Sequence, residues 1–310
     1  MPYDESVPPT PRRRPLFAAA ALAAVCLTAA GCGAGESGGT RAAPRPGDDG
    51  SSAAPPSAPA PEKTSASPTP SPESPKSPKP ADRPVSGPLS GRTVVIDPGH
   101  NPDNHLHTRE INRPVDIGTA RKECDTTGTS TDAGYAEARF TLDVSHRVRD
   151  LLRAQGANVV LTQDGDRPYG PCVDERARIG NEARADAVVS VHADGSAVGN
   201  RGFHVILPGP VRAGKADTSK IVEPSRDLGT RIAGLFVRDT GSAPSNYIGG
   251  GSGLDTREDL GGLNLSTVPK VFIECGNMRD PKDAALLTRA DWRQKAAQGI
   301  ADGISSYLKG

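Results

Sequence analysis

The chain has 310 residues, and 37 Lys plus Arg balance 37 Asp plus Glu, so its formal net charge at pH 7 is zero. A neutral chain lacks the basic footprint of a nucleic-acid-binding protein, and 4% aromatic residues provide few rings to stack on bases or to anchor at a membrane surface. Nucleic acid is therefore excluded as an expected partner, and a membrane is expected to be contacted only through the N-terminal segment.

Residues 1–32 are predicted to form an export signal. Three arginines at positions 12–14 precede an apolar run over residues 16–30, which is the pattern of a secretory signal peptide. The run is shorter than the roughly 20 residues that span a bilayer, so a permanent transmembrane helix is disfavoured. The sequence Ala-Ala-Gly-Cys that ends at Cys32 resembles a bacterial lipobox, although Ala stands where Leu is usual. Cys32 is therefore a candidate for lipidation.

Residues 33–91 are predicted to be a disordered linker. Ser-Pro and Lys-Pro units recur there, for example over residues 71–80, and such segments have too few apolar residues to offset the entropy of ordering. Proline stiffens the linker toward an extended form of about 3 Å per residue. Residues 92–310 are predicted to form one folded domain, since apolar runs and amphipathic patterns start there.

The folded part alternates between two kinds of pattern. Short apolar runs rich in β-branched residues predict buried strands; they are residues 93–96, 159–161, 187–191, 205–207 and 271–273. Apolar residues at helical spacing predict helices; these cover residues 140–152, 174–185, 226–237 and 292–308. This order predicts a single α/β domain in which helices flank a mostly parallel central sheet. Ligands of such sheets bind at the carboxyl ends of the strands.

Two histidines stand at such strand ends. His100 follows the first predicted strand and His192 ends the third, so their imidazoles converge if both strands are central and parallel, as in a metal site. Glu137 lies three residues before the apolar stripe of helix 140–152 begins, and it is therefore expected to project from the buried face at the first helical turn. Each residue alone also fits an ordinary structural role, such as a carboxylate at a helix N-terminus.

Glu274 directly follows the apolar strand 271–273. Burial of an unpaired carboxylate is costly, so a neighbouring cation or a raised pKa is expected. A carboxylate of raised pKa next to an activated water is suited to general-base catalysis. The alternative is a structural ion pair with Arg257 or Arg279.

Three cysteines lie in the folded part. Outside the cell two of them can pair. Cys124 and Cys172 have polar neighbours, whereas Cys275 ends an apolar strand, so a disulfide between Cys124 and Cys172 is expected. It would close a loop of about 49 residues and stabilise the fold by roughly 4 kcal/mol on the loop-entropy model.

Four segments resemble, in order, the signature segments of zinc N-acetylmuramoyl-L-alanine amidases, and the resemblance covers about residues 92–309. The segments are Ile96-Asp97-Pro98-Gly99-His100, Tyr135-Ala136-Glu137-Ala138-Arg139-Phe140, Ser190-Val191-His192-Ala193-Asp194 and Phe272-Ile273-Glu274-Cys275-Gly276-Asn277. The resemblance implies a catalytic Zn²⁺ held by His100, Glu137 and His192, with Glu274 as the catalytic carboxylate.

The implied activity is hydrolysis of the amide between the lactyl group of N-acetylmuramic acid and L-alanine of the stem peptide, in peptidoglycan or in muropeptides. Zinc would lower the pKa of a bound water toward about 7, and Glu274 would move the proton to the leaving amine. The enzyme is expected to be an exported monomer of the cell envelope, lipid-anchored or secreted to the wall. The alternatives are a zinc metallopeptidase acting on the stem peptide and a non-catalytic wall-binding module.

The chain departs from the family pattern near the implied metal. Asn101 replaces a frequent Gly, and Gly276-Asn277 replaces a frequent Gly-Phe. These changes leave the implied ligands and base in place. In some relatives a helix between the first His and the Glu covers the zinc, but here residues 101–134 are rich in Gly and Thr and contain Cys124. A loop pinned by the disulfide is expected instead.

Overall fold

The computed structural model describes residues 86–310. The predicted signal sequence, Cys32 and nearly all of the predicted linker lie outside the described residues. Within the described part, every helix is too short or too polar to cross a membrane.

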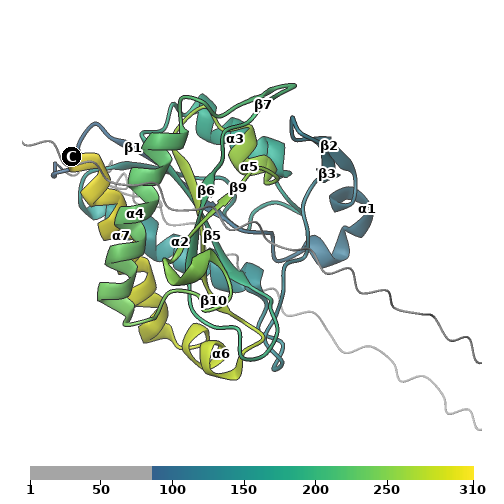
Figure 1. The fold of residues 1–310 in the computed structure, drawn as a ribbon, viewed down its shortest axis with the longest axis vertical. Helices are drawn as coiled ribbons and strands as arrows, with labels where there is room; N and C mark the ends of the chain where they lie inside the picture. Colours follow the sequence, from purple (N-terminus) through teal and green to yellow (C-terminus); the bar gives the residue numbers. More distant parts are fainter. Residues whose placement is uncertain (1–85) are drawn as a thin grey trace, which may run out of the picture. The chain divides into compact units, whose positions relative to one another are not determined.

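A six-stranded sheet lies at the centre of the described part (Figure 1). In sheet order its strands are β4 (Asn158–Leu161), β1 (Thr93–Pro98), β5 (Ala187–Asp194), β10 (Lys270–Asn277), β6 (His204–Pro208) and β9 (Leu254–Arg257). The first four are parallel, whereas β6 pairs antiparallel with β10, and β9 runs parallel to β6. The sheet is thus mostly parallel, as the sequence predicts, with a reversed pair of strands at one edge.

Helices cover both faces of this sheet. Helices α2 (Glu137–Ala154), α4 (Val222–Thr240) and α7 (Ala290–Lys309) pack together over one face, and α4 and α7 run side by side in Figure 1. Helices α3 (Val173–Glu182) and α5 (Gly261–Asn264) contact each other near the other face. The smaller elements are η1 (Asn104–Leu106), α1 (Thr108–Ile111), β2 (Pro114–Asp116), β3 (Arg121–Glu123), β7 (Arg212–Ala213), β8 (Ala216–Asp217), η2 (Gly249–Gly251) and α6 (Pro281–Leu287).

The apolar patterns explain why these layers form. Side chains alternate between the two faces of a strand, so Val94 and Ile96 of β1 join the large core under α2, α4 and α7. Val95 joins a small cluster against which Ile179 of α3 packs. The predicted stripe of α2 is buried in the large core. Gly156, with φ of 90°, follows α2 in the left-handed conformation that commonly ends a helix.

Besides the short elements that the sequence did not predict, an edge strand and the start of the packed part differ from the sequence predictions. Strand β9 was not predicted, because only one of its four residues is apolar and an edge strand needs little burial. Leu89, upstream of the predicted domain start at residue 92, is fully buried in the large core, and its N–H donates to the carbonyl of Gln155. The packed part of the chain therefore begins before residue 92.

The segment between residues 101 and 134 contains helix α1 and the β2–β3 hairpin. The expected disulfide is formed in the structure and joins Cys124, just after β3, to Cys172, just before α3. Cys275 is a free, buried thiol. The disulfide therefore attaches the segment 101–134 to the start of α3, near the edge of the sheet where β1 and β5 end.

Candidate metal centre

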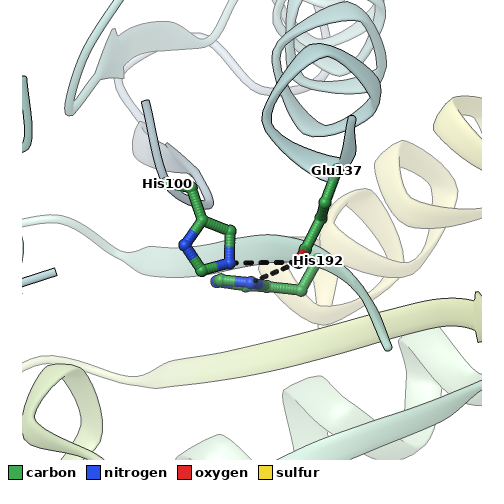
Figure 2. A group of neighbouring side chains, drawn as sticks. All are labelled: His100, Glu137 and His192. Atoms are coloured by element: carbon green, nitrogen blue, oxygen red, sulfur yellow. Dashed lines mark hydrogen bonds and ion pairs between the residues drawn. The ribbon is translucent and has the colours of Figure 1, made fainter. Parts of the chain in front are cut away.

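His100, Glu137 and His192 meet at the carboxyl edge of the sheet, as the sequence predicts (Figure 2). His100 follows β1, His192 lies in β5, and Glu137 is the first residue of α2. Glu137 Oε1 is 3.2 Å from His100 Nε2 and 3.0 Å from His192 Nδ1. One nitrogen of each ring therefore faces the same carboxylate.

Backbone groups hold the side chains of Glu137 and His100 in position. Glu137 Oε2 accepts from the N–H of Thr129 at 2.9 Å, and Oε1 accepts from the N–H of Ala193 at 3.2 Å. His100 Nδ1 lies 3.1 Å from the carbonyl of Thr126. The bond at Nδ1 leaves Nε2 of His100 free to face the carboxylate, which is how outer contacts orient metal-binding imidazoles.

The backbone approaches the site unusually closely. A Cβ at Gly99 would lie 2.3 Å from Cε1 of His192, and a Cβ at Gly128 would lie 2.7 Å from Oε2 of Glu137. His100 itself has a backbone φ of 61°, a conformation that residues other than Gly rarely adopt. The candidate ligands are thus confined on several sides by the backbone.

A buried charge network supports the turn that carries His100. Arg176 of α3 donates to Asp97 Oδ1 at 2.8 Å and to Asp125 Oδ2 at 2.9 Å, and it also bonds the carbonyls of Pro98 and His100. Asp125 Oδ1 in turn lies 3.4 Å from His100 Nδ1. Arg176 and Asp125 were not identified from the sequence. The feature that could have indicated their network is Asp97, a carboxylate at the end of an apolar strand.

The titration of His100 reflects this surrounding negative charge. Burial alone lowers the pKa of an imidazole, but the charges of Glu137 and Asp125 outweigh burial and raise the pKa of His100 to about 10. For Glu137, burial raises the pKa, yet the two histidines shift it well below the usual range. The pocket therefore strongly favours positive charge between the imidazoles and the carboxylate, which a divalent cation supplies.

Glu274 lies beside this group. It pairs in register with His192 on the neighbouring parallel strand, so both side chains share a face of the sheet. Its Oε2 is buried and has no hydrogen-bond partner among residues 86–310. Burial, with the charges of Glu137 and Asp194, raises the pKa of Glu274 well above its usual value.

The alternative ion pair of Glu274 is not formed in the described part of the chain. Arg257 pairs with Asp259, and Arg279 pairs with Asp132. Among residues 86–310, no arginine therefore lies within ion-pair distance of Glu274.

A hollow of about 180 Å³ opens beside the two histidines. Phe272, whose ring stacks on His192, lines it together with Leu260 and Lys122. Lys122 of β3 also pairs with Asp259 at 3.0 Å. The hollow is therefore bounded by the sheet on one side and by the disulfide-linked hairpin on the other.

Residues 94–306 match the N-acetylmuramoyl-L-alanine amidase family. The chain belongs to this family. Rv3717 of Mycobacterium tuberculosis, an N-acetylmuramoyl-L-alanine amidase, is 40% identical over 225 residues, which cover 71% of this chain and 88% of that protein. Among the described residues, the matched range contains all three candidate ligands and Glu274.

Solved amidase structures have the same fold. Ami1 from Mycobacterium smegmatis matches with a TM-score of 0.64 and 40% identity, covering 71% of this chain and 98% of Ami1. Ami1 from Mycobacterium abscessus matches with a TM-score of 0.65 and 40% identity, covering 71% of this chain and 100% of Ami1. The expected activity and fold class are confirmed: the protein is an N-acetylmuramoyl-L-alanine amidase with a single α/β domain.

Proposed function

We propose that this amidase depends on Zn²⁺ held by His100, Glu137 and His192, with Glu274 as the general base. The observation that supports the ligand set is that two imidazole nitrogens and one carboxylate oxygen lie within 4.8 Å of one another. Catalytic zinc sites use this combination of three nitrogen and oxygen ligands and leave a fourth position open. The negative charge around His100 also fits a bound Zn²⁺, as do the hydrogen bonds that orient His100 and Glu137.

A bound Zn²⁺ supplies a Lewis acid that activates water and polarises the lactyl carbonyl. Glu274 stands next to His192 in the sheet and has a pKa raised by burial, so its carboxylate is basic enough to take a proton from the attacking water. The same group then donates that proton to the amine of the leaving L-alanine. The products are a free lactyl carboxylate on the glycan and a free stem peptide.

The substrate we propose is peptidoglycan or the muropeptides released from it, with no nucleic-acid partner. Residues 1–32 would direct export, residues 33–91 would act mostly as a spacer, and residues 92–310, together with the buried Leu89 before them, would carry the catalytic domain. The enzyme would then work in the cell envelope as a monomer, either anchored through a lipid on Cys32 or released into the wall.

Digestion of purified peptidoglycan and of a muramyl tripeptide, followed by mass spectrometry, tests this proposal. The wild-type protein with zinc is expected to release intact stem peptide, and a chelator is expected to abolish the reaction until zinc is restored. The variant Glu274→Gln is expected to bind zinc normally but to lose at least 100-fold in kcat, in line with general-base catalysis.

Glu223→Gln, which changes an exposed carboxyl in α4, is the matched control and should retain wild-type activity. Cleavage within the peptide would instead indicate a metallopeptidase. Full activity of Glu274→Gln would show that Glu274 is not the base.

A further inference from the structure

His204 occupies the same row of the sheet as Glu274 and His192. Glu274 of β10 pairs with His192 of β5 on one side and with His204 of β6 on the other. Paired residues of neighbouring strands project from the same face, with Cβ atoms about 5 Å apart. His204 therefore borders Glu274 on the side opposite the candidate metal ligand.

Both members of this pair carry an unpartnered buried atom. His204 is 4% exposed, and its Nδ1 has no hydrogen-bond partner among residues 86–310. Oε2 of Glu274 is likewise buried and without a partner in that part of the chain. A buried polar atom without a partner destabilises the fold. The two atoms do not bond each other directly, so one buried water between them would satisfy both.

The surroundings of His204 suit it to donate a hydrogen bond. Burial lowers its pKa, and Arg257 adds to this, while the charges of Asp194 and Asp255 act in the opposite direction without overcoming burial. A neutral imidazole has one N–H and one lone pair. The N–H on Nδ1 matches the acceptor that the Glu274 carboxylate offers.

Tyr247 holds the ring of His204 in place. The two rings meet edge to face with centroids 6.0 Å apart, and the Tyr247 hydroxyl donates to Asp194 Oδ2 at 2.6 Å. Asp194 is the last residue of β5, so the contact ties His204 to the strand that carries His192.

We propose that His204 is a positioning residue for Glu274. The Nδ1–H of His204 donates to one buried water, which in turn donates to one carboxylate oxygen of Glu274 and thereby directs the other oxygen toward the reacting water. This inference rests on the proposed role of Glu274 as the general base, but it concerns a residue that lies outside the candidate metal ligands.

Three substitutions in the full-length zinc-loaded protein test the proposal. His204→Asn places an amide N–H near the position of Nδ1, His204→Gln places it near that of Nε2, and His204→Phe keeps a ring without a nitrogen. We expect His204→Phe and His204→Gln to lower kcat on a muramyl tripeptide about 10- to 100-fold, the range found for outer contacts of a catalytic site. KM, zinc content and Tm should change little, and His204→Asn should recover most of kcat.

His146→Phe is the matched control, because His146 lies on α2 and pairs with Asp164 at the surface; its kcat should equal that of wild type. Unchanged kcat in His204→Phe, or equal losses in His204→Asn and His204→Gln accompanied by a lower Tm, would overturn the inference and indicate a packing role. Glu274→Gln is measured in parallel. If Glu274→Gln is inactive while His204→Phe is not impaired, only this inference fails, whereas an active Glu274→Gln refutes the proposed function itself.

Discussion

Individual residues determine how tightly the candidate ligands are held. Gly99 is the sharpest case, since a Cβ there would lie 2.3 Å from Cε1 of His192. This distance is shorter than non-bonded carbon contacts in folded proteins, so either the imidazole or the turn after β1 has to move.

We expect Gly99→Ala to weaken zinc binding by at least 10-fold and to lower kcat accordingly, because a displaced imidazole no longer meets the other two ligands. Titration against a competing zinc chelator measures the affinity. Gly234→Ala is the control, since a Cβ at Gly234 meets nothing within 4 Å. Equal zinc affinities in the two variants would show that the close contact at Gly99 does not position His192.

The lowered pKa of Asp125 predicts that the fold becomes less stable in acid. Although burial alone would raise its pKa, Arg176 and His100 lower it to about 2, from an ordinary value of 3.8. Because the folded-state pKa lies below the unfolded one, the carboxylate stabilises the fold above about pH 4, and this contribution is lost as the pH falls toward 2. The contribution amounts to about 2 kcal/mol.

Urea unfolding of the folded domain between pH 5 and pH 2 tests this expectation. The free energy of unfolding of Asp125→Asn should fall less steeply over this range than that of wild type, although the variant is less stable at pH 7. Asp132→Asn, whose side chain is 75% exposed, should keep the wild-type slope. An unchanged slope in Asp125→Asn would argue against the Arg176 network as the source of acid sensitivity.

At the scale of elements, the disulfide joins the end of the β2–β3 hairpin to the start of α3. Cys124 accepts a backbone bond from Val173 at 2.8 Å, and it is followed directly by Asp125, which contacts His100. The covalent link therefore supports the same turn as the buried charge network.

Replacing both Cys124 and Cys172 by Ser is expected to lower the free energy of unfolding by roughly 4 kcal/mol, because the bond closes a loop with a sequence separation of 48 residues. For a domain of this size the corresponding fall in Tm is about 10 °C. Calorimetry with and without a reducing agent measures it. Reduction should lower the Tm of wild type and leave that of the double variant unchanged. The same change in both proteins would show that the disulfide is not the source of the effect.

At the scale of the whole molecule, the packed domain depends on the segment just before β1. Leu89 is fully buried, and its N–H bonds Gln155 at the end of α2. A fragment of residues 86–310 is expected to fold alone and to cleave soluble muropeptides with the kcat of the full chain. A fragment of residues 92–310 loses the burial of Leu89, about 2 kcal/mol, and should have a lower Tm. Equal Tm values in the two fragments would contradict this account.

Much of the candidate site could be predicted from the sequence. His100, Glu137, His192 and Glu274 each stand where a strand ends or a helix begins, and those boundaries follow from local apolar periodicity. Parallel strands bring their carboxyl ends to one edge, so residues far apart in the chain were expected to meet there. The disulfide could also be predicted from local sequence, because Cys275 is the only one of the three cysteines of the folded part that lies in an apolar strand.

Other features were decided only by the tertiary structure. The reversed strands β6 and β9, the network of Arg176 with Asp97 and Asp125, and the place of His204 beside Glu274 all depend on how distant segments pair. Local periodicity shows which face of a strand is buried, but strand order, direction and register are set by packing among all layers at once. A histidine within a strand therefore has no readable function until its neighbour on the next strand is known.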